Sequence, residues 1–226
     1  PRDWSSDVCS SDLMSERYFG TARHEIVPHL PARVTRLLDI GCGTGATVAL
    51  VKSMRQVEWA GGVEIVASEA ERAGDVCNEV WSTNIESDPI EERIAAGSLD
   101  LVLCLDVLEH LVDPWSVVDR LSTLLAPGGR LIVSVPNIRN WKFIRNLLLK
   151  GDFNYRDSGL LDRTHLRFFV RHTAAALAAH GGLELRHVGG AQPWTGADAR
   201  RVLSVATFGA LDDLMVKQWL VVAERA

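Results

Sequence analysis

Short apolar runs alternate with helix-like stretches along most of the chain, and this order constrains the fold more than any other feature. Residues 99–105 form an apolar run interrupted only by Asp100, as expected of a strand that is covered on both faces. Strands that alternate with helices pack as an α/β fold with a mostly parallel sheet. The expected strands are 36–40, 59–65, 80–82, 99–105, 130–135, 183–188 and 219–224, and the expected helices are 46–54, 67–76, 114–125, 172–180 and 198–214.

The composition excludes several classes of protein. Of 226 residues, 47% are apolar and 23% are charged, which is typical of a globular chain and not of a disordered or coiled-coil one. No run of eighteen apolar residues occurs, so no transmembrane helix is expected. A net charge of −5 argues against broad binding to nucleic acid. The four cysteines form no CxxC pair, which favours a reducing, cytoplasmic location.

The first thirteen residues differ in character from the rest. Residues 1–13 contain Ser-Ser-Asp twice, show no helical or strand period, and lack the basic start and apolar run of a signal peptide. We interpret them as a non-native or disordered leader. The length of the remainder, residues 14–226, predicts a single domain.

A glycine-rich turn follows the first expected strand, in the sequence Asp39-Ile40-Gly41-Cys42-Gly43-Thr44-Gly45. Glycines allow positive φ angles and let a ligand approach the backbone closely. Glu64 lies near the end of the second expected strand, where a carboxylate can accept hydrogen bonds from both hydroxyls of a ribose. The pattern predicts a site for a cofactor that contains a nucleoside.

Two cofactors fit this pattern. Gly41-x-Gly43-x-x-Ala46 satisfies the dinucleotide fingerprint, which would make the chain an NAD(P)-dependent oxidoreductase. S-adenosylmethionine instead has no phosphate and carries an ammonium, for which Asp39 supplies a carboxylate beside the turn. Because a carboxylate aimed at a pyrophosphate is unfavourable, Asp39 favours S-adenosylmethionine.

Residues 38–45 resemble the first motif of the class I S-adenosylmethionine-dependent methyltransferases, and similar motifs follow in order at 62–65, 84–85, 99–111 and 125–131. The resemblance, to the small-molecule branch of the family, implies a Rossmann-like seven-stranded sheet whose last strand is antiparallel. It also implies S-adenosylmethionine as methyl donor and S-adenosylhomocysteine as product. The cofactor contacts expected from the turn, the ribose acid and the resemblance are Asp39, Gly41, Cys42, Gly43, Gly45, Glu64, Ile65, Asn84 (where the family often has Asp), Ile85, Asp106, Val107 and Leu108.

An insertion at about 137–171 interrupts the alternation after the fifth expected strand, at the edge of the sheet where ligands bind in open α/β folds. Between 139 and 171 it holds eight Lys and Arg against three Asp, a local charge of +5. This charge fits an anionic substrate, or an ordinary solvated face. Residues 141–150 form an amphipathic, cationic helix pattern, typical of a lid or of a contact with a membrane surface or lipid-linked acceptor.

Within the insertion, residues 157–169 are similar to a segment of bacterial methyltransferases associated with cell-surface polysaccharide synthesis. This similarity implies a hydroxyl of a saccharide or related metabolite as acceptor. A hydroxyl benefits from a general base, for which His165 is the first candidate and His110 the second, with Asp162 as an orienting group. The residues expected to contact the substrate are Trp141, Tyr155, Arg163 and Arg167.

Two further questions stay open in the sequence. Glu109 and His110 are adjacent, but no further ligands follow at a convincing spacing, so no metal site is predicted. A catalytically silent domain that binds S-adenosylmethionine and serves as an assembly partner is the remaining alternative to an enzyme. The oligomeric state is not determined by these patterns.

Overall fold

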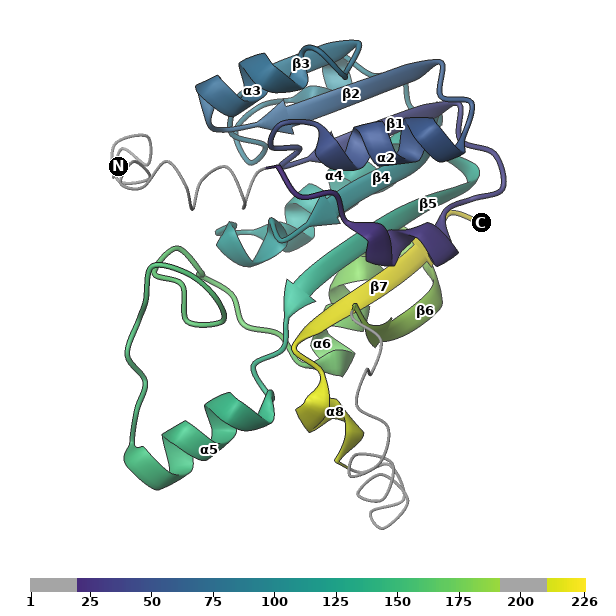
Figure 1. Ribbon diagram of the computed structural model, residues 1–226. Helices are drawn as coiled ribbons and strands as arrows, with labels where there is room; N and C mark the ends of the chain where they lie inside the picture. Colours follow the sequence, from purple (N-terminus) through teal and green to yellow (C-terminus); the bar gives the residue numbers. More distant parts are fainter. Residues whose placement is uncertain (1–19, 192–210) are drawn as a thin grey trace. The chain divides into compact units, whose positions relative to one another are not determined.

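The computed structural model describes residues 20–191 and 211–226. Seven strands form one sheet in the order β3-β2-β1-β4-β5-β7-β6 (Figure 1). The neighbours β1–β2 and β2–β3 pair in parallel, whereas β6 and β7 pair antiparallel. This is the Rossmann-like arrangement with an antiparallel last strand that the sequence predicts. The strands are β1 (Arg36–Ile40), β2 (Trp59–Glu64), β3 (Glu79–Ser82), β4 (Leu99–Leu105), β5 (Leu125–Pro136), β6 (Glu184–Gly190) and β7 (Gln218–Glu224).

The chain divides into two compact units. The first unit comprises Pro1–Leu103 and Thr123–Arg130. Its sheet strands β1 and β2 are apolar and buried, and α3 packs against β2 and β3. Asp100 of β4 ties the start of β1 in place, because its carboxylate accepts hydrogen bonds from the Thr35 and Arg36 amides at 2.7 and 3.0 Å. The helices of this unit are η1 (His24–His29), α2 (Ala46–Met54), α3 (Ala67–Ala73) and η2 (Ile90–Glu92).

The second unit comprises Cys104–Ser122 and Leu131–Ala226. Asn140 caps the N-terminus of α5 by accepting a hydrogen bond from the Lys142 amide at 3.2 Å, and Gly151 ends this helix with a φ of +62°. α6 packs against β6 and β7. The helices of this unit are η3 (Leu108–His110), α4 (Pro114–Leu124, whose last two residues belong to the first unit), α5 (Trp141–Lys150), α6 (Arg171–Ala178), η4 (His180–Gly182) and α8 (Asp212–Met215).

The predicted bounds of β1, α2, β4 and the helix 141–150 are confirmed. The strand expected at 130–135 begins earlier than predicted, because β5 already starts at Leu125 and continues through residues 127–129. Gly128 takes a φ of +75° within the strand, and Gly129 leaves no room for a side chain beside the Leu99 carbonyl. The predicted helix 67–76 ends at Ala73, and the helix predicted at 198–214 lies largely outside the described residues.

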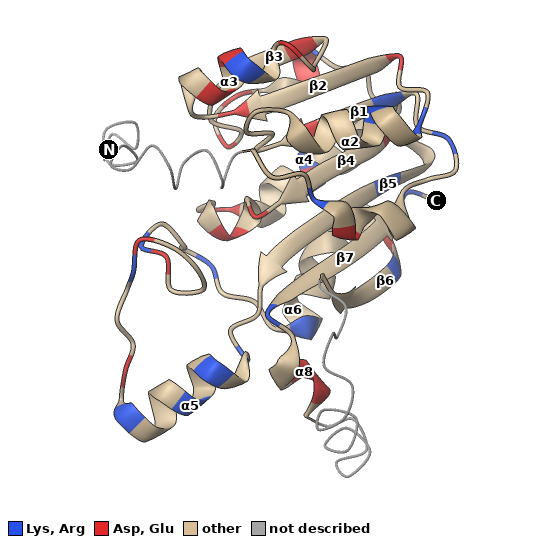
Figure 2. Ribbon diagram, in the orientation of Figure 1, with Lys and Arg blue, Asp and Glu red and all other residues tan. Residues whose placement is uncertain are grey.

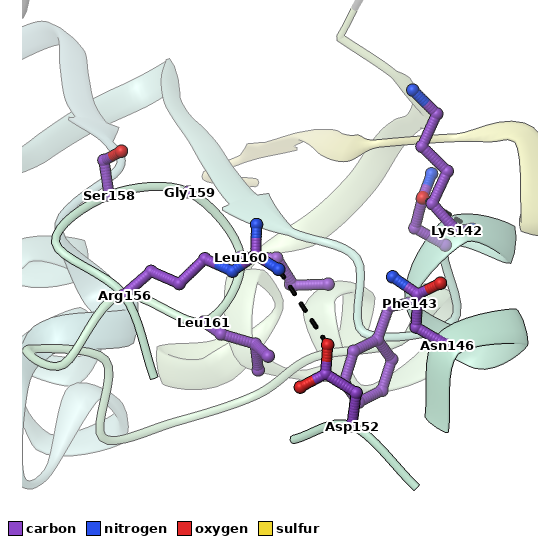
Figure 3. Close-up of a pocket in the computed structure, with 10 residues that line it drawn as sticks. Lys142, Phe143, Asn146, Asp152, Arg156, Ser158, Gly159, Leu160 and Leu161 are labelled. Atoms are coloured by element: carbon purple, nitrogen blue, oxygen red, sulfur yellow. Dashed lines mark hydrogen bonds and ion pairs between the residues drawn. The ribbon is translucent and has the colours of Figure 1, made fainter. Parts of the chain in front are cut away.

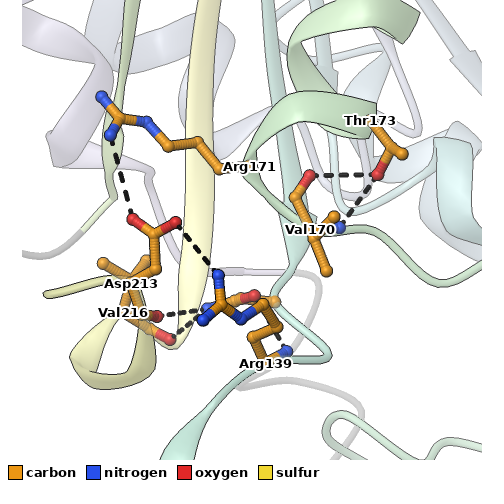
Figure 4. A network of polar contacts seen from close by, with 7 residues as sticks. Arg139, Val170, Arg171, Thr173, Asp213 and Val216 are labelled. Carbon is orange, nitrogen blue, oxygen red and sulfur yellow. Dashed lines mark hydrogen bonds and ion pairs between the residues drawn. The ribbon is translucent and has the colours of Figure 1, made fainter. Parts of the chain in front are cut away.

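Both ends of the insertion are fixed to the second unit. Asn137 is fully buried and its side-chain amide donates to the carbonyl oxygens of Asp213 and Val216, at 2.7 and 2.9 Å. The Asp213 carboxylate lies between Arg139 and Arg171, at 3.8 and 3.9 Å (Figure 4). These contacts explain why an insertion of about thirty-five residues begins and ends at defined positions.

Candidate cofactor and acceptor sites

The glycine-rich turn adopts the conformation that its sequence requires. Gly41, Gly43 and Gly45 have φ angles of +70°, +53° and +80°, which side chains rarely adopt. The amides of Gly41 and Cys42 both donate to the Val63 carbonyl, at 2.7 and 3.1 Å, so the turn is fixed to the end of β2. The turn therefore has no side chains at its three glycines and is held in place by hydrogen bonds where a cofactor would approach it.

Glu64 joins the turn to the start of α3. Its carboxylate is buried and accepts hydrogen bonds from the Gly43 amide and from the Val66 amide, both at 2.9 Å. Burial raises the pKa of Glu64, while the amides of Val66, Gly43 and Ile65 oppose this shift. Each carboxylate oxygen has a second lone pair, so Glu64 can also accept from a ribose diol.

Asp39 is the second buried carboxylate of this unit, at 3% exposure. Burial raises its pKa well above the ordinary value, and nearby Cys77 and Glu64 add to the shift, whereas Arg23 opposes it. A buried carboxylate is costly unless it meets a donor or a positive charge. The residue therefore suits the ammonium of S-adenosylmethionine and would oppose a pyrophosphate.

The expected cofactor contacts Ile65, Asn84 and Ile85 lie in two different environments. Ile65 follows β2 and keeps 56% of its surface exposed, as a side chain that stacks on a ligand would before binding. Ile85 is buried, and the exposed Asn84 uses its side-chain oxygen to accept from the Glu86 amide at 2.9 Å. Asn84 therefore begins a turn, which satisfies its carbonyl oxygen but leaves its amide group available.

The side chain of Cys42 is buried beneath the glycine-rich turn. Its thiol is buried beside Gly62 and Cys77, and a Cβ on Gly62 would lie 2.7 Å from the Cys42 sulfur. Hydrogen bonding to Cys77 and burial raise the pKa of the Cys42 thiol. The side chain thus packs the underside of the turn, and the cofactor contact predicted for this position stays a prediction for its main chain.

In the second unit, Asp106 follows β4 with a φ of +60°, the only positive φ of a non-glycine residue in the described chain. Such strain concentrates at functional sites. Its carboxylate accepts hydrogen bonds from the Ser134 hydroxyl, at 3.2 Å, and from the Gln218 side-chain amide. These partners hold the segment 106–108, for which the sequence predicts cofactor contacts.

The side chains of Glu109, His110 and His165 lie together in this unit. Glu109 and His110 belong to η3, and the His165 ring contacts the His110 ring edge-on with centroids 4.7 Å apart. The backbone carbonyl of Glu109 accepts from the amides of Leu166 and Arg167, at 2.8 and 2.9 Å, which fixes the insertion onto η3. Both histidines that the sequence predicts as bases therefore share one site.

Hydrogen bonds define the protonation of both rings. His165 Nδ1 lies 3.1 Å from the Leu160 carbonyl, which can only accept, so Nδ1 carries a proton. His110 Nδ1 lies 2.9 Å from the Thr164 hydroxyl and 3.3 Å from its carbonyl oxygen. Burial, and to a lesser degree His165, lowers the pKa of His110, against the effects of Asp162, the Thr164 carbonyl and Asp106. A neutral imidazole is thus favoured at His110.

Glu109, His110 and His165 also offer ligand atoms within 4.8 Å of one another. The sequence does not predict this group because His165 lies 55 positions beyond His110, and only the fold of the insertion brings it back.

A cavity of about 230 Å³ lies within the insertion (Figure 3). Arg156 and Asp152 approach each other across it at 4.0 Å. Leu160, whose carbonyl oxygen holds the His165 ring, is part of its wall. The cavity is lined by Asn140, Lys142, Phe143, Asn146, Asp152, Arg156, Ser158, Gly159, Leu160 and Leu161.

The four residues predicted to contact the substrate do not line this cavity. Arg163 pairs with Asp157 at 3.1 Å, and Arg167 donates to the Val112 carbonyl. Trp141 lies under the Arg145 guanidinium at 4.6 Å, and Tyr155 is half exposed beside Phe153. The cavity residues Asn146 and Asp152 were not singled out in the sequence, because no local motif marks them.

The predicted basic character of the insertion is visible along α5, whose exposed surface carries Lys142, Arg145 and Lys150 (Figure 2). Beside these charges, Leu148 and Leu149 keep 76% and 78% of their surface exposed. No helix in the described ranges has the length and apolar character needed to cross a membrane.

Comparison with known proteins agrees with this geometry. Residues 14–188 match the model of a methyltransferase domain family. The ubiquinone biosynthesis O-methyltransferase of Albidiferax ferrireducens is 32% identical over 186 residues, 75% of this chain and 68% of that protein. That of Xylella fastidiosa is 30% identical over 192 residues, 75% of this chain and 70% of that protein. The crystal structure of an S-adenosylmethionine-dependent methyltransferase from Archaeoglobus fulgidus, 18% identical, superimposes with a TM-score of 0.63 over 96% of this chain and 100% of that one.

The chain belongs to the S-adenosylmethionine-dependent methyltransferases. It is an enzyme that transfers a methyl group from S-adenosylmethionine to a small molecule, and the NAD(P) alternative is set aside. Similarity to polysaccharide-associated methyltransferases has no support among these relatives. The individual contact residues remain predictions.

The raised pKa values of Asp39 and Glu64 predict that binding of S-adenosylmethionine depends on pH. A positive ammonium beside Asp39 favours the ionised carboxylate, so the pKa falls on binding and a proton is released. The affinity for S-adenosylmethionine therefore rises with pH between the pKa of Asp39 in the bound protein and its higher pKa in the free protein. Titration calorimetry in two buffers of different ionisation enthalpy measures the released proton. Asp39→Asn should bind more weakly and release fewer protons, and equal release from this variant would contradict the assignment.

Proposed function

We propose that the enzyme methylates a hydroxyl oxygen of its acceptor. The observation that carries this proposal is the pair of imidazoles in the second unit, each with its Nδ1 engaged by an oxygen of the protein. A hydroxyl is a weak nucleophile until its proton is removed, and a histidine near neutrality is the group most often used for this. The O-methyltransferase names of the relatives support the same chemistry.

S-adenosylmethionine supplies an electrophilic methyl group on a good leaving group, so the protein mainly aligns and activates the acceptor. In this proposal Glu64 binds the ribose hydroxyls, Asp39 binds the ammonium, and the glycine turn lets the cofactor approach the backbone. Nε2 of His165, or of its neighbour His110, receives the acceptor proton.

Apolar and aromatic side chains of the insertion favour an acceptor with an aromatic or apolar body. Phe153 contacts Phe143, Tyr155 and Phe168 edge-on, with centroids 5.6, 5.7 and 6.4 Å apart. Phe153 and Tyr155 remain 41% and 51% exposed, although such rings are usually covered. With the basic residues of α5, this surface suits a phenolic molecule that carries an acidic group or apolar tail. A saccharide hydroxyl, predicted from residues 157–169, is the alternative.

An acceptor panel distinguishes these classes. The wild-type enzyme is incubated with methyl-labelled S-adenosylmethionine and either dihydroxybenzoates with and without a prenyl tail, or uronic acids and sugar nucleotides. We expect labelled product from the dihydroxy aromatic compounds, with faster turnover when the tail is present. Product from the sugars alone would overturn the aromatic assignment, and transfer to an amine or thiol alone would overturn the oxygen assignment.

A further inference from the structure

We propose that Thr164 and Asp162 are positioning residues that hold His110 with its proton on Nδ1, and so aim a lone pair on Nε2 at the acceptor. This inference rests on the proposed function and adds to it a chain of groups that the sequence does not reveal. The chain runs from the Asp162 carboxylate through the Thr164 hydroxyl to His110 Nδ1, over distances of 2.7 and 2.9 Å.

The direction of each hydrogen bond in this chain follows from its first member. An ionised carboxylate can only accept, and Asp162 Oδ1 accepts from both the Thr164 hydroxyl and the Thr164 amide, the latter at 2.8 Å. The hydroxyl proton of Thr164 therefore points to Asp162, and its oxygen lone pairs face His110. Two lone pairs cannot face each other at 2.9 Å, so Nδ1 of His110 carries a proton.

The backbone fixes the same groups from a second direction. The His165 amide donates to the Asp162 carbonyl at 3.1 Å, and the Leu166 amide donates to the Glu109 carbonyl at 2.8 Å. Thr164 lies between these two bonds, so its side chain is held against η3 while the loop closes on itself. A rigid hydroxyl in this place selects one tautomer of His110 without a large entropic cost on each turnover.

In the proposed reaction, the hydroxyl of the acceptor loses its proton when it is methylated. As the oxygen–carbon bond forms and the sulfur–carbon bond breaks, the sulfur keeps its electron pair and the acceptor proton leaves. His110 Nε2 can take this proton directly or from His165, and the resulting imidazolium still donates from Nδ1 to Thr164. The negative charge of Asp162 then stabilises that cation through the hydroxyl.

The test combines tautomer and rate measurements on matched variants. Nitrogen-15 NMR of imidazole-labelled protein reports which ring nitrogen of His110 carries the proton. In the wild type we expect Nδ1–H. In Thr164→Val we expect a mixture with Nε2–H, because only the longer contact with the Thr164 carbonyl, at 3.3 Å, then remains as an acceptor. In Thr164→Ser we expect the wild-type state. Loss of a neutral hydrogen bond predicts a fall in kcat of about 10-fold for Thr164→Val, with KM nearly unchanged and recovery in Thr164→Ser.

The possible outcomes separate this inference from the proposed function. An Nε2–H wild-type ring, or a Thr164→Val enzyme with unchanged tautomer and kcat, overturns the positioning role while oxygen methylation stands. If Thr164→Val does not fold, Asp162→Ala offers the same readouts, because it removes the acceptor that orients the hydroxyl. Tautomers as expected in an enzyme that methylates no hydroxyl would overturn the proposed function instead.

Discussion

Glu64→Ala should weaken the binding of S-adenosylmethionine by at least about 100-fold in a calorimetric titration. The wild-type carboxylate can accept from both ribose hydroxyls, and each hydrogen bond to a charged group contributes about 1.5–3 kcal/mol. The variant also releases the Gly43 and Val66 amides, both now held at 2.9 Å, so the turn itself loses an anchor. Both effects lower the affinity.

Two variants separate these effects. Glu64→Gln keeps one oxygen acceptor and replaces the other with an amide NH2 group that can only donate, so it should retain part of the anchor and still bind the ribose poorly. Glu71→Gln removes an exposed carboxylate from the neighbouring helix α3 and should bind as the wild type does. Wild-type affinity in Glu64→Ala, measured on a folded variant, would remove Glu64 from the cofactor site.

His165→Asn and His110→Asn should each lower kcat by about 10²- to 10⁴-fold, the range that a positioned general base contributes. The affinity for S-adenosylmethionine should stay unchanged, because in the proposed mechanism these rings contact the acceptor and not the cofactor. The double variant should lose little more than the stronger single one, since the two imidazoles act on the same proton.

His172→Asn provides the matched control. His172 is an exposed histidine on α6, and its replacement should leave kcat and KM as they are. Full turnover in both single variants and in the double variant would contradict the base role of the pair. A fall in affinity for S-adenosylmethionine with no change in kcat would indicate that His110 and His165 contact the cofactor and not the acceptor.

The geometry of the glycine turn and of Glu64 could be predicted because its determinants are local. The three glycines of the turn need positive φ angles, and Glu64 follows directly in the next strand, so their chemistry can be read from spacing alone. Asp39 could be chosen as the group that separates two cofactors because its charge suits only one of them. The order of strands and helices predicted the sheet for the same reason, since each element has its own period of apolar residues.

The acceptor half could be predicted only as a list of residue types. His110 and Thr164 are 54 positions apart, and the hydrogen bond between them depends on how the insertion folds back onto η3. The same limit applies to the expected cofactor contact Asp106, because its partners Ser134 and Gln218 belong to two later strands and carry no motif. Asp162 was expected to orient a histidine, and the structure shows its carboxylate accepting from the Thr164 hydroxyl, which lies 2.9 Å from His110 Nδ1. Arg163, chosen for its charge, pairs with Asp157 instead.

The most direct test of oxygen methylation is the carbon-13 spectrum of the transferred methyl group. The enzyme is supplied with S-adenosylmethionine labelled at that carbon and with the acceptor that turns over fastest in the panel. A methoxy resonance in the isolated product, absent when the histidine double variant is used at the same concentration, is the predicted result. A resonance of methyl bound to nitrogen, sulfur or carbon would contradict the account.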